Sequence, residues 1–555
     1  MSVKAKKLLI FMVAVGLIVT SLTVYAASKK VEVKPEDSII RVTEDWPTYI
    51  DPAVGSDFSD SIALVNLYDS LVFPQPDGTV KPQLATGWTV SPDGKTYTFN
   101  IRKGVKFHNG DELKASDVEF SLQRMLKIGE GYGYLFTSTV ASVKATGDYK
   151  LEIKLKEPFG PFILSLVRLY VVNKKQVMEH IEKNGQYGEM GDYGKKWLLT
   201  HDAGSGPYKV KEMKMEEYLL AEKFDNFWKG WDPQAPRYFK ESGSVEPVTV
   251  RTLVSRRELE ITDELQPLEN YDTMAKIPGI KIATFFNGHN LNMMLNTKKP
   301  PTDDIHFRKA LSYILDYNTI TTRIYPGSKP ARGPVPFNLP GFDNTIKGYT
   351  RDVAKAREEL AKSRYADKLD QYPVELTWCA EAPEEEKIAL LFQANAAEIG
   401  IKVNITKKPF GSMIADAQKM ETTPNASVVF VAPHYAEAGS MLSTRYHSSS
   451  AGTWEQMEWL QDKEIDKMIE DALATVDQAQ RFAKYAKIQK KIVELAPTIW
   501  LFDQAERRAY QANYIVWPTA ERASTGKIFT SVMGYDQYAH DMKVYPEKRA
   551  GLLQK

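Results

Sequence analysis

Short segments in which apolar and polar residues alternate characterise the first half of the chain. Every second residue is apolar at positions 97–101, and positions 151–155 repeat this pattern. A period of two predicts half-buried strands, and the turn sequence at 91–94 leads into the first of them. Segment 374–379, which ends at Cys379, has a similar strand-like composition.

The second half of the chain has apolar residues at helical spacing. Segments 307–315, 465–476 and 482–496 each carry apolar residues every three to four positions, and Pro497 ends the last of them. In the first half, Ser116 and Glu119 have the spacing of a capping box, with Ser116 at the N-cap. Strands that alternate with helices in this way predict an α/β protein.

Length and composition narrow the class of protein. A chain of 555 residues exceeds what one hydrophobic core usually serves, so two or three lobes are expected. The 72 basic and 71 acidic residues nearly balance, which gives no basic face for nucleic acid and predicts no nucleic-acid partner. A single cysteine, Cys379, excludes intrachain disulfides and cysteine-rich metal sites.

The N-terminus has the pattern of a secretory signal. Three lysines precede an uncharged, apolar stretch at 8–24, and Ala26 provides a cleavage site. This stretch is at the short limit for spanning a bilayer, so we expect residues 1–26 to be a cleaved signal peptide, with an uncleaved membrane anchor as the alternative. No cysteine lies nearby to carry a lipid, and the predicted location is periplasmic or extracytoplasmic.

A long motif resembles a known family. Residues 85–110, ATGWTVSPDGKTYTFNIRKGVKFHNG, resemble the signature of the extracellular solute-binding proteins of family 5, which serve ABC importers of the peptide/nickel class. Segments 204–208, 307–311 and 399–403 are also similar to this family, and the resemblance extends over about residues 40–520. It implies a binding protein whose partners are a small-molecule ligand and the membrane permease subunits of an ABC importer.

The resemblance also implies an architecture, the two-lobed periplasmic-binding-protein fold with a hinge and an inserted third subdomain in lobe I. Family members hold the solute in the cleft between the lobes and close around it. The expected limits are 27–290 for lobe I, about 66–200 for the subdomain inserted in it, 291–498 for lobe II, 499–555 for the return to lobe I, and 285–292 and 496–502 for the hinge.

Two ligand classes remain open within this family. Its peptide binders hold the peptide ammonium with an aspartate of a lobe II loop, and His434 stands at the corresponding position here. The preceding strand, 427–431, has no arginine for a peptide carboxylate, although Glu437 replaces the aspartate if the alignment shifts by three residues. Because an unpaired buried ammonium is costly, we favour a neutral oligosaccharide slightly over an oligopeptide.

Sugar binding requires flat aromatic faces and hydrogen-bonding groups in loops near the cleft, while peptide binding requires a carboxylate there. The candidate ligand-binding residues are Trp46, Tyr49, Trp378, His434, Tyr435, Glu437 and Trp454.

Other functions have weaker support in the sequence. A nickel chelate is a third ligand class in the family, but the eight histidines lack metal-site spacing, and we expect neither a protein-held metal nor a cofactor. A secreted glycoside hydrolase needs only two carboxylates across a cleft, and the sequence does not exclude such a pair. No nucleophile-elbow motif is present, and together with the family resemblance this favours a binding protein over an enzyme. We expect the protein to be monomeric.

Overall fold

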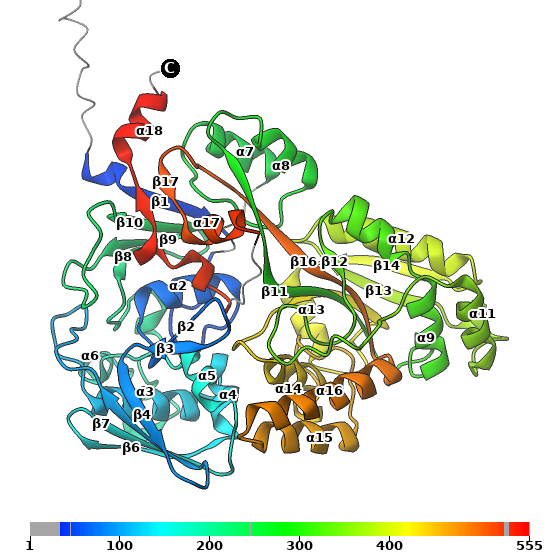
Figure 1. The fold of residues 1–555 in the computed structure, drawn as a ribbon, viewed down its shortest axis with the longest axis horizontal. Helices are drawn as coiled ribbons and strands as arrows, with labels where there is room; N and C mark the ends of the chain where they lie inside the picture. The colour runs from blue at the N-terminus through cyan, green and yellow to red at the C-terminus, as the bar shows by residue number, and fades with distance from the viewer. Residues whose placement is uncertain (1–33, 45, 244–245, 527–531, 554–555) are drawn as a thin grey trace, which may run out of the picture.

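The computed structural model describes residues 34–44, 46–243, 246–526 and 532–553, and the predicted signal peptide lies outside them. Two lobes are joined by two long antiparallel strands, β11 (Lys281–Leu295) and β16 (Thr498–Tyr510), which run from one lobe into the other (Figure 1). Their pairing changes register between Phe286 and Asn290, where Gly288 has a φ of +77°. This irregularity falls in the first of the two segments predicted to form the hinge.

Lobe I is built on a four-stranded sheet of order β1-β10-β9-β8, in which β1 and β10 are parallel. The end of the chain returns to this lobe, where β17 and β18 pair and α17 packs against β11. The elements of lobe I are β1 (Ile39–Thr43), α2 (Phe58–Leu67), β8 (Tyr208–Lys214), β9 (Tyr218–Lys223), β10 (Tyr238–Ser242), α7 (Pro247–Ser255), α8 (Leu268–Met274), β17 (Ile515–Val516), α17 (Pro518–Ser524), β18 (Lys543–Val544) and α18 (Pro546–Leu553).

A smaller subdomain is inserted after α2 and contains the antiparallel sheet β4-β5-β7-β6. The two strands predicted from alternation are β5 and β7, and they pair with each other. The elements are β2 (Val72–Pro74), β3 (Val80–Pro82), β4 (Ala85–Val90), β5 (Thr96–Ile101), α3 (Ala115–Ile128), α4 (Tyr134–Thr137), β6 (Val140–Gly147), β7 (Lys150–Leu155), α5 (Phe162–Ser165) and α6 (Lys174–Glu179).

The predicted cap of the first subdomain helix is wrong by two residues. Helix α3 has Lys114 and not Ser116 at its N-cap. The carboxylate of Asp117 accepts the backbone N–H of Lys114 at 2.9 Å, so the acidic residue at the third helical position closes the cap without a serine.

Lobe II has a six-stranded sheet of order β12-β16-β11-β15-β13-β14, covered by helices. The three long segments with helical spacing are α9, α15 and α16, as predicted, and segment 374–379 is strand β13. The remaining elements are α10 (Tyr317–Thr319), β12 (Lys329–Pro330), α11 (Val353–Lys362), α12 (Glu384–Ala397), β14 (Val403–Lys408), α13 (Phe410–Ala417), β15 (Ala426–Val431) and α14 (Ala438–Tyr446), besides α9 (Ile305–Ile314), β13 (Val374–Cys379), α15 (Lys463–Ala474) and α16 (Gln478–Leu495).

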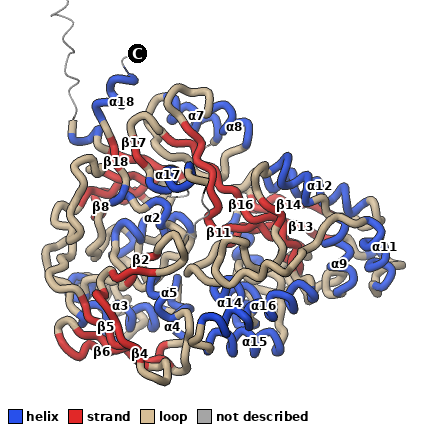
Figure 2. Tube along the Cα trace, viewed as in Figure 1, coloured by secondary structure: helices blue, strands red, loops and turns tan. Residues whose placement is uncertain are grey.

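Strands occupy the middle of lobe II and helices its outside. Figure 2 shows β11, β13, β14 and β16 side by side, with α12, α9 and α11 at the outer edge and α14, α15 and α16 below the sheet. One hydrophobic cluster fills the space between the sheet and α9–α12, and a second fills the space between the sheet and α14–α16. Each lobe therefore has its own core, as the length of the chain led us to expect.

The lobes touch each other through the inserted subdomain. The backbone N–H of Gly160 donates to Leu473 O at 2.7 Å, and Arg168 Nε donates to His434 O at 2.9 Å. These two hydrogen bonds join the inserted subdomain to lobe II. The domain limits themselves stay a prediction.

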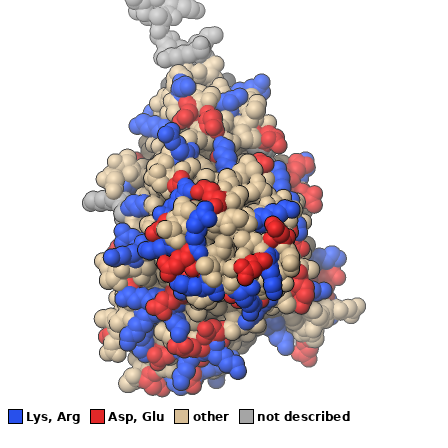
Figure 3. Space-filling view, turned by 90° about the vertical axis from the view of Figure 1, so that its right-hand side faces the viewer, with Lys and Arg blue, Asp and Glu red and all other residues tan. Residues whose placement is uncertain are grey.

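The surface and the helix lengths add two observations. Figure 3 shows one face of the molecule, over the lobe II end, on which basic and acidic side chains are interspersed without a patch of one sign. Within the described residues, no helix has the length and apolar character needed to cross a membrane.

Candidate ligand-binding cavity

A cavity of about 380 Å³ lies between the two lobes. Its lobe II wall is formed where the parallel strands β13, β14 and β15 end, since Cys379, Phe410 and His434 lie at or just after these ends. The carboxyl ends of parallel strands are the usual position of binding sites in α/β proteins. The cavity is therefore the candidate ligand site.

Lobe I contributes an acidic wall. Glu44 directly follows β1, Asp57 is the N-cap of α2, and Asp263 and Glu264 follow the bridge between Ile261 and Val42. Asp57 accepts the backbone N–H of Asp60 at 2.7 Å, which positions its carboxylate at the start of the helix. Short local turns thus bring carboxylates from three separate segments to one side of the cavity.

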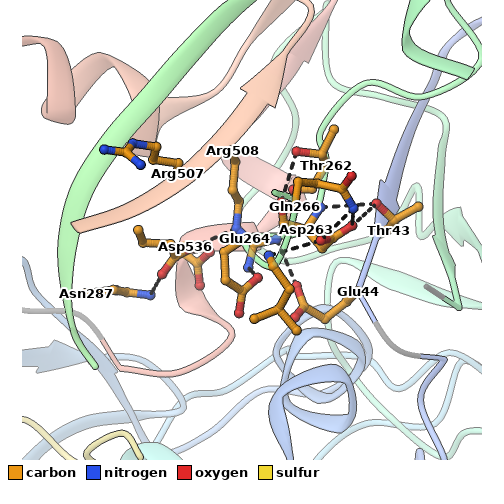
Figure 4. A network of polar contacts seen from close by, with 12 residues as sticks. Thr43, Glu44, Thr262, Asp263, Glu264, Gln266, Asn287, Arg507, Arg508 and Asp536 are labelled. Carbon is orange, nitrogen blue, oxygen red and sulfur yellow. Dashed lines mark hydrogen bonds and ion pairs between the residues drawn. The ribbon is translucent and has the colours of Figure 1, made fainter. Parts of the chain in front are cut away.

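Behind this wall, one arginine holds three carboxylates (Figure 4). Arg508 of β16 lies 2.8 Å from Glu44, 2.6 Å from Glu264 and 2.7 Å from Glu506. Its neighbour Arg507 points away from the cluster, because successive side chains of a strand alternate.

Burial dominates the titration of this cluster. It raises the pKa of Glu44 although Arg508 opposes the shift, and it raises the pKa of Glu506 to about 7. One arginine does not offset the burial of three carboxylates, so removal from water still disfavours their ionised forms.

On the lobe II side, two glutamates follow β13. Glu385 is fully buried at the start of α12, and its Oε2 accepts the backbone N–H of Cys379 at 2.8 Å. Its Oε1 has no hydrogen-bond partner among the described residues, and burial raises the pKa of this carboxyl well above its usual value. Glu381 accepts the Phe410 N–H at 3.0 Å and the Cys379 thiol at 3.1 Å.

Two imidazoles complete the wall. His289 belongs to β11, and burial lowers its pKa to about 4, so it is neutral near pH 7. His434 Nε2 lies 3.0 Å from Glu455 Oε1, while His434 Nδ1 has no partner within the part of the chain that the structure describes. No group of three histidine, cysteine or acidic residues there is arranged to hold a metal ion.

The structure brings two of the seven predicted residues to the cavity. His434 and Trp454 line it, and Trp454 packs against the Phe410 ring with centroids 5.4 Å apart. Their contact with a ligand stays a prediction.

The remaining aromatic candidates lie outside the cavity wall. Trp46 is half-buried in a lobe I loop, and Tyr49 is 40% exposed. Trp378 belongs to the lobe II core beneath the Lys407 side chain, and Tyr435 is buried in the cluster that joins the inserted subdomain to lobe II. Composition indicated aromatic residues near the cleft, but it could not indicate which way each ring points.

Glu437 is a correction to the sequence-based alternative. It is fully buried, pairs with Arg481 through two bonds of 2.8 Å and accepts the Tyr485 hydroxyl at 2.8 Å. Both carboxylate oxygens are thereby satisfied inside lobe II, so Glu437 is not free to hold a ligand ammonium.

The acidic wall residues were missed by sequence reasoning. Glu381 and Glu385 stand directly after a predicted strand, and this position at a strand end is the signal that could have found them. Glu44 and Asp57 are far in the sequence from Asp263 and Glu264, and only the fold places the two pairs together.

The family model of bacterial extracellular solute-binding proteins, family 5 Middle, matches residues 79–453, which is more than half of the chain. The chain belongs to this family. Its members bind solutes outside the cytoplasm, so the predicted class, a binding protein and not a glycoside hydrolase, is confirmed.

Similar proteins agree with the family. The probable D,D-dipeptide-binding periplasmic protein DdpA of Escherichia coli is 27% identical over 482 residues, which cover 85% of this chain and 89% of that protein. The periplasmic binding protein DppA of Helicobacter pylori, solved with peptide STSA, has a TM-score of 0.78 at 22% identity and covers 91% of this chain and 98% of its own. NikZ of Campylobacter jejuni, solved with Ni(L-His), has a TM-score of 0.77 at 17% identity, covering 92% and 100%. The predicted two-lobed fold of this family 5 protein is confirmed.

Proposed function

We propose that this family 5 protein binds a short peptide in the interlobe cavity and delivers it to the permease subunits of an ABC importer of the peptide/nickel class. The observation that carries the proposal is Glu385, a buried carboxylate with an unpartnered oxygen on the cavity wall. A cationic group of a peptide, either its N-terminal ammonium or a basic side chain, supplies both a charge and a hydrogen bond to such a group.

A neutral sugar fits this wall less well. Its hydroxyl groups can donate hydrogen bonds, but they bring no charge to offset buried carboxylates, and buried ionised groups without a counter-charge are costly. The similar proteins named above are described by dipeptides, a peptide or a nickel–histidine complex, and they give no support to the oligosaccharide that we favoured from the sequence.

Contacts from both lobes make the cavity suitable for capture by closure. A ligand shifts a hinge equilibrium only if it binds the closed form better than the open form. Glu264 of lobe I and Glu385 of lobe II lie on opposite walls, so a peptide that reaches both stabilises closure. We further propose that the exported protein begins after Ala26, which N-terminal sequencing of secreted material tests. We also propose that it is monomeric.

Calorimetric titration tests the proposed ligand class. The exported protein is titrated with a pool of di- to tetrapeptides and, separately, with cello- and manno-oligosaccharides. We expect saturable heat with peptides. Saturable heat with an oligosaccharide alone would overturn the peptide proposal and leave the family unaffected.

A further inference from the structure

The cavity wall is strongly unbalanced in charge. Six carboxylates line it, whereas the described wall residues include neither lysine nor arginine. The six are Glu44, Asp57, Asp263, Glu264, Glu381 and Glu385. A wall built for an ordinary dipeptide, which has one ammonium and one carboxylate, needs groups of both signs.

Apart from Asp57, these acids have too few cationic partners among the described residues. Arg508 pairs with Glu44 and Glu264, but it also pairs with Glu506, so one guanidinium serves three carboxylates. Asp263 receives neutral donors, the Gln266 amide and the Thr43 hydroxyl. On the opposite wall, Glu381 and Glu385 receive backbone and thiol donors, and no cation of the described residues pairs with them.

A second observation shows that the cavity is incomplete without a donor. Glu385 is 0% exposed and borders the cavity, and its Oε1 has no hydrogen-bond partner in the described part of the chain. A native protein seldom leaves a buried carboxylate oxygen unsatisfied, because the desolvation penalty is then not recovered. A donor from the ligand satisfies it.

For a ligand carboxylate the wall offers neutral donors and two imidazoles, but no lysine or arginine among the described residues. Both ring nitrogens of His289 and Nδ1 of His434 have no hydrogen-bond partner among the described residues, and burial lowers the pKa of His289 to about 4, so His289 brings no charge near pH 7. The described wall therefore offers several carboxylates to positive groups of a ligand and no permanent cation to a negative one.

We infer that the ligand of this cavity carries a net positive charge, as in a peptide whose ammonium and basic side chain are held by carboxylates of the two lobes. This inference rests on the proposed peptide-binding function and specifies the substrate class within it. Burial raises the pKa of Glu44 and Glu385, so these groups ionise in the closed cavity at a cost when no cation is present. A cationic ligand stabilises their ionised forms and thereby favours the closed form.

The decisive comparison uses two peptides that differ in one charge. Lys-Ala-Ala and the same peptide with an acetylated lysine side chain have the same backbone and a similar length, but acetylation removes the side-chain charge. The full exported protein is titrated with each, and with the diamine cadaverine as a cation that is not a peptide. We expect Lys-Ala-Ala to bind at least tenfold tighter than its acetylated form.

The possible results distinguish the net-charge inference from the proposed peptide binding on which it rests. Equal affinity for the two peptides overturns the net-charge inference while peptide binding stands. Binding of cadaverine without either peptide keeps the net-charge inference and overturns the peptide proposal. Binding of none of the three overturns both.

Two variants test whether the lobe II wall selects for the charge of the lysine side chain. Glu385→Gln keeps an oxygen for the Cys379 N–H but removes the charge, and Glu386→Gln makes the same change one residue away on the exposed side of α12. We expect the preference for Lys-Ala-Ala over its acetylated form to fall about tenfold in Glu385→Gln and to stay unchanged in Glu386→Gln. Equal weakening of both peptides by Glu385→Gln contradicts the inference, because this carboxylate then holds only the N-terminal ammonium that both peptides share. Glu381→Gln, at an exposed position of the same wall, gives the same test if Glu385→Gln does not fold.

Discussion

Two buried glutamates of lobe II show how differently the fold uses the same side chain. Glu437, the N-cap residue of α14, is buried in the interior and accepts hydrogen bonds from the Arg481 guanidinium and the Tyr485 hydroxyl of α16. Glu385, on the cavity wall, accepts one backbone N–H, and its other oxygen has no partner within the described ranges. Both are 0% exposed, so burial alone does not distinguish them.

The difference lies in where the compensating charge comes from. Arg481 offsets the burial of Glu437 permanently, which makes that pair part of the lobe II structure. Glu385 lacks such a group among the residues that the structure describes, and a ligand in the cavity can supply it. A buried carboxylate therefore indicates a binding site only when its partners within the protein are too few.

The largest expected effect is on the interior. Glu437→Gln leaves Arg481 buried without its counter-ion, and removing one partner of a buried pair costs about 3–5 kcal/mol of stability. We expect the thermal unfolding midpoint of the ligand-free protein to fall by several degrees in scanning calorimetry.

Glu385→Gln is the matched control for this loss. It removes a carboxylate that has no cationic partner, so the ligand-free midpoint stays the same or rises. A larger loss of stability in Glu385→Gln than in Glu437→Gln would contradict the distinction between interior and wall.

Two tryptophans divide in the same way and give the next prediction. Trp378 is 3% exposed in the core, and Trp454 is half-buried on the wall. Truncating a buried tryptophan costs about 3–5 kcal/mol, so Trp378→Ala lowers the unfolding midpoint. Trp454→Ala instead weakens peptide affinity more than tenfold, or about 1.4 kcal/mol, with a smaller change in the midpoint. Calorimetric titration and thermal unfolding of both variants measure the two effects.

The amphipathic elements were predictable from the sequence, but the partition of side chains between interior and wall was not. Strand β5 and helices α9, α15 and α16 follow from local periodicity, which one segment contains by itself. The partner of Glu437 is 44 residues away, and Arg508 meets Glu44 across more than 460 positions. Trp378 and Cys379 are neighbours in β13, yet one faces the core and the other the cavity, because strand residues alternate. The sequence alone did not show that Cys379, and not its neighbour Trp378, faces the cavity.

The dependence of binding on pH sharpens the contrast further. Burial raises the pKa of Glu385, Glu44 and Asp263 in the folded protein. At a pH between the usual and the raised pKa, the ligand-free folded protein therefore keeps protons on these groups that the unfolded chain has already released. Stability contributed by these groups is therefore present at low pH and is lost as the pH rises from that value through each raised pKa.

A cationic ligand has the opposite preference, because it stabilises the ionised carboxylates. Binding then releases protons, and affinity increases with pH. Titration calorimetry in two buffers of different ionisation enthalpy measures the number released, and we expect fewer protons from Glu385→Gln. Proton uptake on binding of Lys-Ala-Ala would contradict the assignment of Glu385 as its partner.

The smallest expected effect is at the surface. Lys387 of α12 lies 3.9 Å from Glu269 of lobe I, and their side chains are 49% and 76% exposed. This ion pair connects the two lobes, and Lys387 lies on the same helix as Glu385. The pair is therefore an alternative explanation of what holds the closed form together. Exposed ion pairs usually contribute under about 1 kcal/mol, because water screens both charges, and Lys387 also has Glu384 at 2.8 Å. We therefore expect Lys387→Gln to change peptide affinity less than threefold and to leave the ligand-induced decrease in radius of gyration intact. A loss of that decrease, measured by small-angle scattering at saturating peptide, would place the control of closure on the surface and not in the acidic wall.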